Sequence, residues 1–148
     1  LFPTRNFGRQ GHRQTTAEGD KGMLGYLVVF VGAGVGGAAR HGMNIWVARL
    51  MGTHFPWHTL TINILGSLVM GLIIGWFAER LGAAGHLRLF LATGVMGGFT
   101  TFSAFSLDAV LLWERHEHLL AVLYVGGSVA GAIAGLALAL WIMGKALA

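Results

Sequence analysis

One interrupted segment constrains the fold of this chain more than any other feature. Residues 94–106, GVMGGFTTFSAFS, lie inside an apolar run that extends from about residue 87 to residue 113. Three glycines in five residues, followed by four hydroxyl side chains in seven, disfavour a regular lipid-facing helix. In hydrocarbon, irregular backbone is tolerated only where it is buried in protein or lines a wet cavity. The segment therefore predicts a membrane helix that is broken near a functional site.

Four apolar segments predict an all-α integral membrane protein. They cover residues 24–39, with an amphipathic extension to 51, and residues 57–78, 87–113 and 119–143. Only 11% of the residues are charged, whereas a typical soluble domain has about 25%. Three short connections separate the segments: residues 52–56, 79–86 and 114–118. We therefore expect residues 23–148 to form one four-helix transmembrane domain.

The first 22 residues differ from the rest of the chain. They are polar and have no apolar period, so we expect residues 1–22 to be disordered. Met23 directly precedes the first apolar segment and suggests that residues 1–22 are a non-native extension. A cleaved secretory signal is a second interpretation, but Arg40 and more apolar sequence follow the small residues at 37–39 at once.

Composition excludes two further classes. The net charge is +4, but basic side chains and aromatic residues do not interleave in a patch, so we expect no nucleic-acid partner. The chain has no cysteine, which excludes disulfides and thiolate metal sites.

Basic residues divide evenly between the two sides of the four predicted spans when residues 1–22 are left out. These residues are Arg80, Arg88 and Lys145 on the side of the second connection and the C-terminus, and Arg40, Arg49 and Arg115 on the other side. A bias in Lys and Arg sets membrane orientation, and here there is none. The balance permits insertion in both orientations and an antiparallel homodimer. Including residues 1–22 would favour one orientation.

Glycines recur at a spacing of four residues and predict close helix contacts in the membrane. The sets are Gly32 with Gly36, Gly71 with Gly75, and Gly127 with Gly131 and Gly135.

Two short motifs resemble a nucleotide-binding and a metal-binding pattern, but neither fits its surroundings in the sequence. Residues 32–37, GAGVGG, match a dinucleotide-binding pattern, but the next acidic residue is Glu79, too late for a ribose contact. Residues 116–118, HEH, lack the spacing of a helical zinc motif and lie in a charged connection. The sequence therefore predicts no enzyme site.

Polar side chains inside the spans are the remaining candidates, because such residues usually face the protein interior or a pathway. Asn63 shares one helical face with Thr59 and with Ser67 (or Gly66), at a spacing of about four residues. An interhelical hydrogen bond with a structural role is the alternative for Asn63. Asp108 is the one acidic residue well inside a span, and Tyr124 and Ser128 lie four residues apart on the last.

Four motifs resemble the CrcB/Fluc family of small fluoride channels. Residues 97–106, GGFTTFSAFS, are similar to the family's third-helix signature, and residues 59–66, TLTINILG, to its second-helix motif. Residues 36–40, GGAAR, and 124–128, YVGGS, resemble the first- and fourth-helix motifs. The resemblance implies a multi-pass protein of the bacterial inner membrane that exports fluoride passively.

The resemblance also implies an antiparallel homodimer with two pores and a structural sodium ion (Na+) at its centre. In the family, backbone carbonyls hold the sodium, and they fall on Gly97 and Thr100 here. The implied pore residues are Asn63, Phe102, Phe105, Ser103, Thr59, Tyr124 and Ser128. This chain departs from some members at Ala132, where a serine is found, and at Asp108, which is often Glu.

The chemistry of these residues suits fluoride. A small, tightly hydrated anion needs donors in place of water, and the Asn63 amide and the Ser and Thr hydroxyls supply them. Aromatic rings have a positive edge, so Phe102 and Phe105 can stabilise an anion edge-on without binding it tightly. A small multidrug exporter is one alternative, but it needs an acidic residue in the first span, where residues 24–39 have none. A non-transporting assembly subunit is another, and it would not require donors and aromatics at a helix break.

Overall fold

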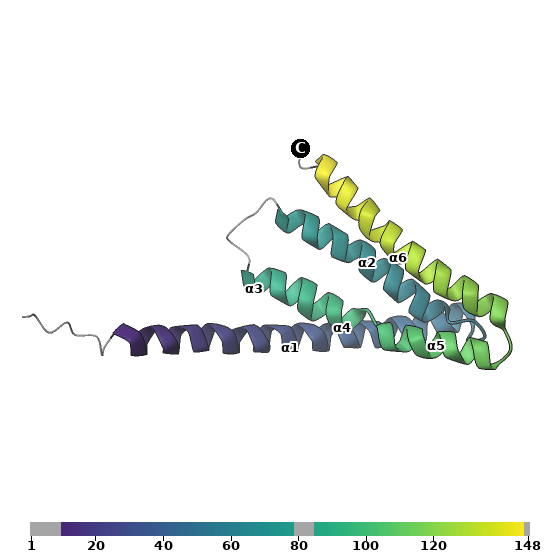
Figure 1. Ribbon diagram of the computed structural model, residues 1–148, viewed down its shortest axis with the longest axis horizontal. Helices are drawn as coiled ribbons and strands as arrows, with labels where there is room; N and C mark the ends of the chain where they lie inside the picture. Colours follow the sequence, from purple (N-terminus) through teal and green to yellow (C-terminus); the bar gives the residue numbers. More distant parts are fainter. Residues whose placement is uncertain (1–9, 79–84, 147–148) are drawn as a thin grey trace, which may run out of the picture.

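The protein is described here by a computed structural model that covers residues 10–78 and 85–146. Within these residues the elements follow in the order α1 (Gln10–Met51), α2 (Trp57–Ala78), α3 (Gly85–Arg88), η1 (Leu89–Met96), α4 (Gly97–Phe99), α5 (Phe102–Glu114) and α6 (His118–Ala146) (Figure 1). The element η1 is a π-helix, and the others are α-helices.

Four stretches of the described chain are long and apolar enough to cross a membrane. They are Gly22–Met51, Trp57–Ala78, Gly85–Glu114 and His118–Ala146, with mean hydropathies between 1.5 and 2.0. The third stretch runs through α3, η1, α4 and α5. The prediction of an all-helical protein with four spans is confirmed, because each apolar run is long enough to satisfy its backbone within a helix.

The structure differs from the expectation at the N-terminus. Residues 10–22, which we expected to be disordered, are helical, since α1 begins at Gln10. Extending an existing helix costs little, and this stretch contains Gln, Arg, Ala, Glu and Lys, which favour helix. The 42 residues of α1 span about 63 Å, roughly twice the hydrocarbon thickness. Residues 1–9 lie outside the described residues, and the hypothesis that residues 1–22 are a non-native extension stays a prediction.

Helices α2 and α6 pack side by side along their length (Figure 1). A Cβ added at Gly71 would lie 2.7 Å from the Cβ of Ala139, and one at Gly75 would lie 2.5 Å from the Cβ of Met143. A Cβ at Gly131 would lie 2.6 Å from Ile64. The contacts at Gly71 and Gly75 leave no room for a Cβ, as the spacing predicted, whereas at Gly131 the neighbour is the end of the flexible Ile64 side chain. Gly127 differs, because nothing in the described chain lies within 4 Å of a Cβ placed there.

Helix α1 packs just as closely against η1 and α4. A Cβ at Gly32 would lie 2.7 Å from the carbonyl oxygen of Phe90, and one at Gly36 would overlap the carbonyl of Val95. Gly98 of α4 approaches the backbone of Ala33 in the same way. Backbone contact at three glycines fixes the first half of the third span against α1.

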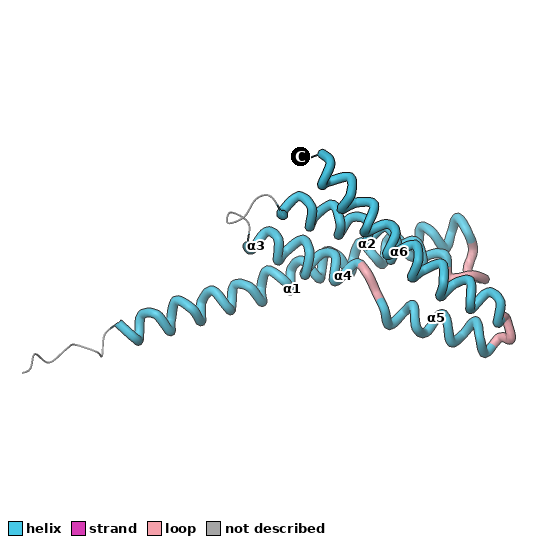
Figure 2. Tube along the Cα trace, turned by 45° about the horizontal axis from the view of Figure 1, so that its top comes forward, coloured by secondary structure: helices cyan, strands magenta, loops and turns pink. Residues whose placement is uncertain are grey.

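Extended backbone at Thr100 and Thr101 separates α4 from α5. Thr100 has φ −78° and ψ 158°, and Thr101 has φ −152° and ψ 118°. Figure 2 shows this segment as a loop between the two helices. Helix α5 follows this loop, displaced from the axis of α4, and packs against α6. A small core closes this end of the molecule, made of Leu112, Ala121 and Tyr124 with Phe55, Leu60, Phe105, Ala109 and Leu120 around them.

Candidate functional site

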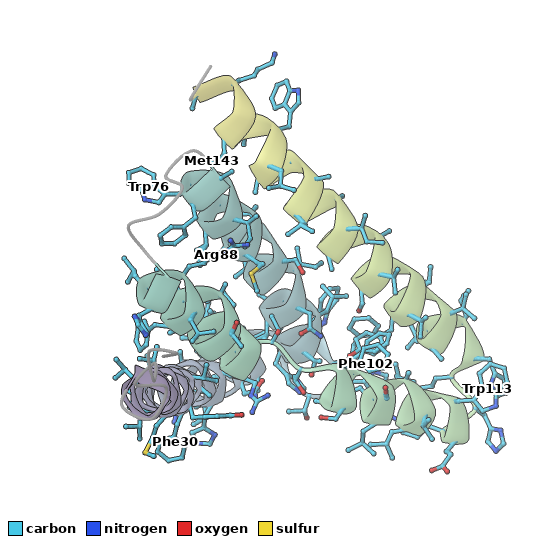
Figure 3. All side chains as sticks on the ribbon, turned by 60° about the vertical axis from the view of Figure 1, so that its left-hand side comes forward. Phe30, Trp76, Arg88, Phe102, Trp113 and Met143 are labelled. Carbon is cyan, nitrogen blue, oxygen red and sulfur yellow. The ribbon has the colours of Figure 1, made fainter. Side chains whose placement is uncertain are left out.

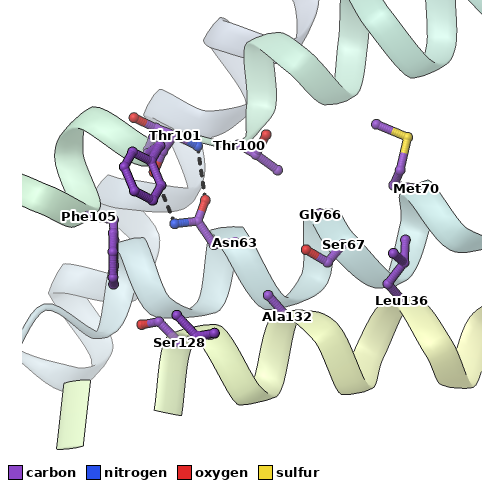
Figure 4. Close-up of a pocket in the computed structure, with 12 residues that line it drawn as sticks. Asn63, Gly66, Ser67, Met70, Thr100, Thr101, Phe105, Ser128, Ala132 and Leu136 are labelled. Carbon is purple, nitrogen blue, oxygen red and sulfur yellow. Dashed lines mark hydrogen bonds between the residues drawn. The ribbon is translucent and has the colours of Figure 1, made fainter. Parts of the chain in front are cut away.

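Asn63 on α2 pairs with the extended main chain at Thr101 (Figure 4). Its Nδ2 donates to the carbonyl oxygen of Thr101 at 3.0 Å, and its Oδ1 accepts from the backbone N–H of Thr101 at 2.9 Å. Both polar groups of the Thr101 main chain are therefore satisfied by one side chain from another helix. Without it, extended backbone at this depth would leave a donor and an acceptor unpaired.

Thr100 is held from three directions. Its backbone N–H and its hydroxyl both donate to the carbonyl oxygen of Met96, at 3.0 and 2.9 Å. Its methyl group lies so close to Gly66 that a Cβ there would overlap it. The guanidinium of Arg40, from α1, lies 3.5 Å from its carbonyl oxygen. Thr100 is thus ordered by contacts from α1, α2 and its own helix.

The side chain of Thr101 begins α5. Its hydroxyl accepts from the backbone N–H of Ala104 at 3.2 Å, which is an N-cap interaction. The hydroxyl of Ser103 lies 3.3 Å from that of Thr101. Phe102 and Phe105 follow on the first turn of α5, with ring centroids 5.4 Å apart. Figure 3 shows Phe102 at the start of this helix. The N-cap at Thr101 therefore sets the start of α5 and with it the positions of Phe102 and Phe105.

These residues surround a first cavity of about 380 Å³ between α2, α5 and α6. Its lining consists of Asn63, Gly66, Ser67, Met70, Thr100, Thr101, Phe102, Phe105, Ser128, Val129, Ala132 and Leu136 (Figure 4). The hydroxyl oxygen of Ser128 is buried and has no hydrogen-bond partner among the described residues. Leaving a buried hydroxyl unpaired costs about 1–3 kcal/mol, so this position favours a polar guest.

A second cavity of about 410 Å³ lies on the side of α1. It is lined by Gly37, Arg40, His41, Asn44, His58, Thr59, Thr101, Ser103, Ala104 and Asp108. This lining is polar and includes the Arg40 guanidinium. Thr101 lines both cavities, so the residue that Asn63 holds also separates them.

Tyr124 does not line the first cavity but contacts one of its lining residues, Phe105. Its side chain is fully buried, and its hydroxyl donates to Asp108 at 3.2 Å. Its ring lies 5.4 Å from that of Phe105 and 5.7 Å from that of Phe55. Tyr124 therefore supports Phe105 and gives the Asp108 carboxylate a donor. The shorter Asp side chain at this position still reaches this tyrosine.

The structure distributes the predicted site residues over the two cavities. The first holds Asn63, Thr100, Phe102, Phe105 and Ser128, and the second holds Arg40, Thr59, Ser103 and Asp108. Tyr124 and Gly97 line neither of these two. Ala132 lines the first cavity and leaves that part of the wall apolar. The resemblance implies a serine at this position in some family members.

One residue that matters here, Thr101, was not singled out from the sequence. Thr101 is both the hydrogen-bond partner of Asn63 and the N-cap of α5. Threonine is a common N-cap residue, and this preference was the sequence feature that could have indicated the cap. Gly66, which the sequence placed as an alternative to Ser67 on the face of Asn63, receives the methyl group of Thr100.

The carbonyls of Gly97 and Thr100 have lost their regular helical donors. In an α-helix, Gly97 would accept from the N–H of Thr101, which here donates to Asn63. Thr100 would accept from the N–H of Ala104, which here donates to the Thr101 hydroxyl. Backbone carbonyls without their helical donors suit a hard cation such as sodium. No cluster of His, Asp and Glu that could bind a metal occurs among the described residues.

Comparisons with known proteins are consistent with these features. Residues 27–140 match the family model described as CrcB-like protein, Camphor Resistance (CrcB). The fluoride-specific ion channel FluC of Rhodopseudomonas palustris (strain BisB5) is 61% identical over 111 residues, which cover 75% of this chain and 90% of that protein. FluC of Methylobacterium nodulans is 63% identical over 113 residues, covering 76% and 90%. FluC of Mesorhizobium japonicum is 52% identical over 120 residues, covering 81% and 96%.

Proposed function

The chain belongs to the CrcB family of ion channels, and we propose that it is a fluoride-specific channel that lets fluoride leave the cytoplasm passively. The family consists of channels rather than enzymes. One observation carries the proposal for this chain. The first cavity combines an unpaired buried hydroxyl, that of Ser128, with the Asn63 amide and the rings of Phe102 and Phe105.

This set of groups suits fluoride. The hydroxyl and the amide donate hydrogen bonds in place of water, and the ring edges carry partial positive charge. None of these groups carries a full charge, so each holds the anion weakly enough to release it. Weak sites in series are what a conducting pathway needs.

The second cavity provides the route by which fluoride reaches the first cavity. Arg40 lies in its wall with Thr59 and Ser103, which offer an anion a positive charge and hydroxyl donors, and the Asp108 carboxylate in the same wall is hydrogen-bonded to Tyr124. Thr101 then separates this cavity from the first. We propose that fluoride passes between the two cavities at this residue.

The direction of net movement follows from acid–base chemistry and the membrane potential. Fluoride enters a cell as the neutral acid and dissociates inside. A potential that is negative inside favours exit of an anion by about 2.3 kcal/mol per 100 mV. A passive channel in the bacterial inner membrane would therefore lower cytoplasmic fluoride without an energy source.

An antiparallel homodimer completes the proposed site. Phe102 is 78% exposed in the single chain, although it lines the first cavity, and Gly97 is also exposed. A second copy of the chain would cover both. The balance of three basic residues on each side of the four spans permits the two orientations that such a dimer requires.

A structural sodium ion fits the carbonyls of Gly97 and Thr100, whose helical donors bond elsewhere. When bound, the ion would supply positive charge at the broken third helix. The residues of this chain hold the two carbonyls in place: Asn63 diverts the N–H of Thr101, and Thr101 caps α5.

Fluoride efflux from liposomes tests the proposal. The purified protein is reconstituted in vesicles loaded with potassium fluoride, and efflux is started with a potassium ionophore and followed with a fluoride electrode. We expect rapid fluoride efflux, no chloride efflux, and neither in protein-free vesicles. Equal chloride efflux, or efflux that requires a proton gradient, would contradict a fluoride channel.

A further inference from the structure

We propose that Asn63 is a positioning residue whose amide holds the main chain of Thr101 and so sets the orientation of α5. The two hydrogen bonds, at 3.0 and 2.9 Å, are here called the Asn63–Thr101 clamp. They join positions that are 38 residues apart in the sequence. This role is additional to that of a pore-lining donor, because the N–H and the oxygen that bond to Thr101 act on the protein rather than on the ion.

The clamp requires a primary amide. Thr101 presents one donor and one acceptor, and an asparagine side chain presents the complementary pair. An aspartate in this place could still accept from the N–H but could not donate to the carbonyl. A leucine, which has a similar shape, could do neither. The N–H and C=O of Thr101 would then lack partners in an apolar setting.

The clamp also accounts for the released carbonyl of Gly97. An N–H of Thr101 that bonded to Gly97 would continue the helix through residue 101. Asn63 takes this N–H instead, so α4 ends at Phe99 and the backbone becomes extended. Helix α2 makes a second contact one turn later, where Gly66 accommodates the methyl group of Thr100.

The orientation of α5 depends on the same residue. With its main chain held, Thr101 directs its hydroxyl to the N–H of Ala104 and caps α5. The first residue of α5 is Phe102, and Phe105 follows one turn later. The clamp therefore acts on the rings through the cap. This inference rests on the proposed function only in taking these rings to line the path of fluoride.

The positioning role leaves one N–H of the Asn63 amide unaccounted for. An asparagine has two N–H donors on Nδ2, and one bonds to Thr101. The clamp fixes the plane of the amide and hence the direction of the second N–H. Asn63 can thus offer fluoride a single donor of fixed direction.

Amide hydrogen exchange tests the clamp. The wild type and the variants Asn63→Leu, Asn63→Gln and Ser67→Ala are placed in lipid nanodiscs without fluoride, and exchange is followed residue by residue by NMR. In Asn63→Leu we expect exchange at Thr101 and Ala104 to accelerate about tenfold, with the middle of α6 unchanged. Ser67→Ala, a change in the same cavity one turn along α2, should leave Thr101 as in the wild type. Unchanged exchange at Thr101 in Asn63→Leu would overturn the proposal.

Rescue separates positioning from a general structural role. Asn63→Gln keeps the donor and the acceptor, so it should recover part of the protection at Thr101 and, in liposomes, part of the fluoride flux. Flux that recovers without protection would overturn the positioning role. If Asn63→Leu does not fold, solid-state NMR of the isotope-labelled wild type provides the test. A direct dipolar contact between Asn63 Nδ2 and the Thr101 carbonyl carbon supports the clamp, and its absence overturns it.

The two proposals fail separately. Exchange is measured without fluoride, so its result does not depend on conduction. A chain with a protected Thr101 amide but no fluoride flux would contradict the proposed function and leave the clamp standing.

Discussion

The guanidinium of Arg40 lies 3.5 Å from the carbonyl oxygen of Thr100, a residue 60 positions later in the chain. The same carbonyl is one of the two proposed for sodium. A guanidinium carries a full positive charge, and like charges that share one ligand oxygen repel each other. Arg40 and a sodium ion at Thr100 should therefore oppose each other.

Replacing Arg40 should strengthen sodium binding. In Arg40→Gln, we expect the sodium concentration that gives half of the thermal stabilisation to fall about tenfold, because the repelling charge is gone. The measurement is the unfolding temperature in detergent as sodium replaces an organic cation at constant ionic strength. His41→Gln, a neighbouring change in the second cavity, is the control and should keep the wild-type midpoint. An unchanged midpoint in Arg40→Gln would argue against sodium at the Thr100 carbonyl.

Asn63→Asp should reduce fluoride flux at least about a hundredfold. The carboxylate cannot donate to the Thr101 carbonyl, and its charge repels the anion and is costly in a membrane. Flux is measured in liposomes, and gel filtration checks that the variant is folded. A folded variant that conducts normally would make Asn63 a packing residue only.

Phe102→Ile and Phe105→Ile should each lower the flux about tenfold, since both keep apolar bulk but remove the positive ring edge. Their stabilities should differ. Phe105 packs against the rings of Phe102 and Tyr124, so its variant should lose about 1 kcal/mol, whereas Phe102 is exposed in the single chain. Normal flux in both variants would remove the support for an aromatic mechanism.

Tyr124→Phe should lower the free energy of unfolding by about 1.5–3 kcal/mol, because the Asp108 carboxylate loses a hydroxyl donor. The measurement is chemical unfolding in detergent of Tyr124→Phe, Asp108→Asn and the double variant. We expect the two single effects to be non-additive, as for residues in direct contact. Simple additivity would mean that the hydrogen bond contributes nothing to stability.

A chain that starts at Met23 should insert in both orientations. The variants Arg80→Cys and Arg115→Cys are treated in intact cells with an impermeant thiol reagent, and the absence of native cysteine leaves no background. Partial labelling at both positions is expected from the balanced charges. Full labelling at one position and none at the other would contradict dual topology. The full chain is the comparison, because its four additional basic residues at positions 1–22 favour one orientation.

Much of the architecture was predictable because it depends on the hydrophobicity and length of contiguous segments of the sequence. The second apolar run was expected at residues 57–78, and α2 occupies Trp57–Ala78. Hydrophobicity and length are enough to predict a membrane helix, since no other element satisfies its backbone in lipid except a closed barrel. The resemblance to the CrcB family is confirmed for the same reason: the motifs are contiguous and can be read directly.

The sequence alone therefore determined four spans, the family, and a segment at 94–106 that a regular helix does not favour. The tertiary structure decided which groups in that segment are paired. Nothing local indicates that Asn63 bonds to Thr101, that the ring of Tyr124 contacts that of Phe105, or that the Ser128 hydroxyl is buried without a partner among the described residues. These relationships depend on how α2, α5 and α6 pack, because the rotation of each helix about its axis sets which side chains meet. The helical state of residues 10–22 was likewise missed, since it continues from the span that follows rather than from its own apolar pattern.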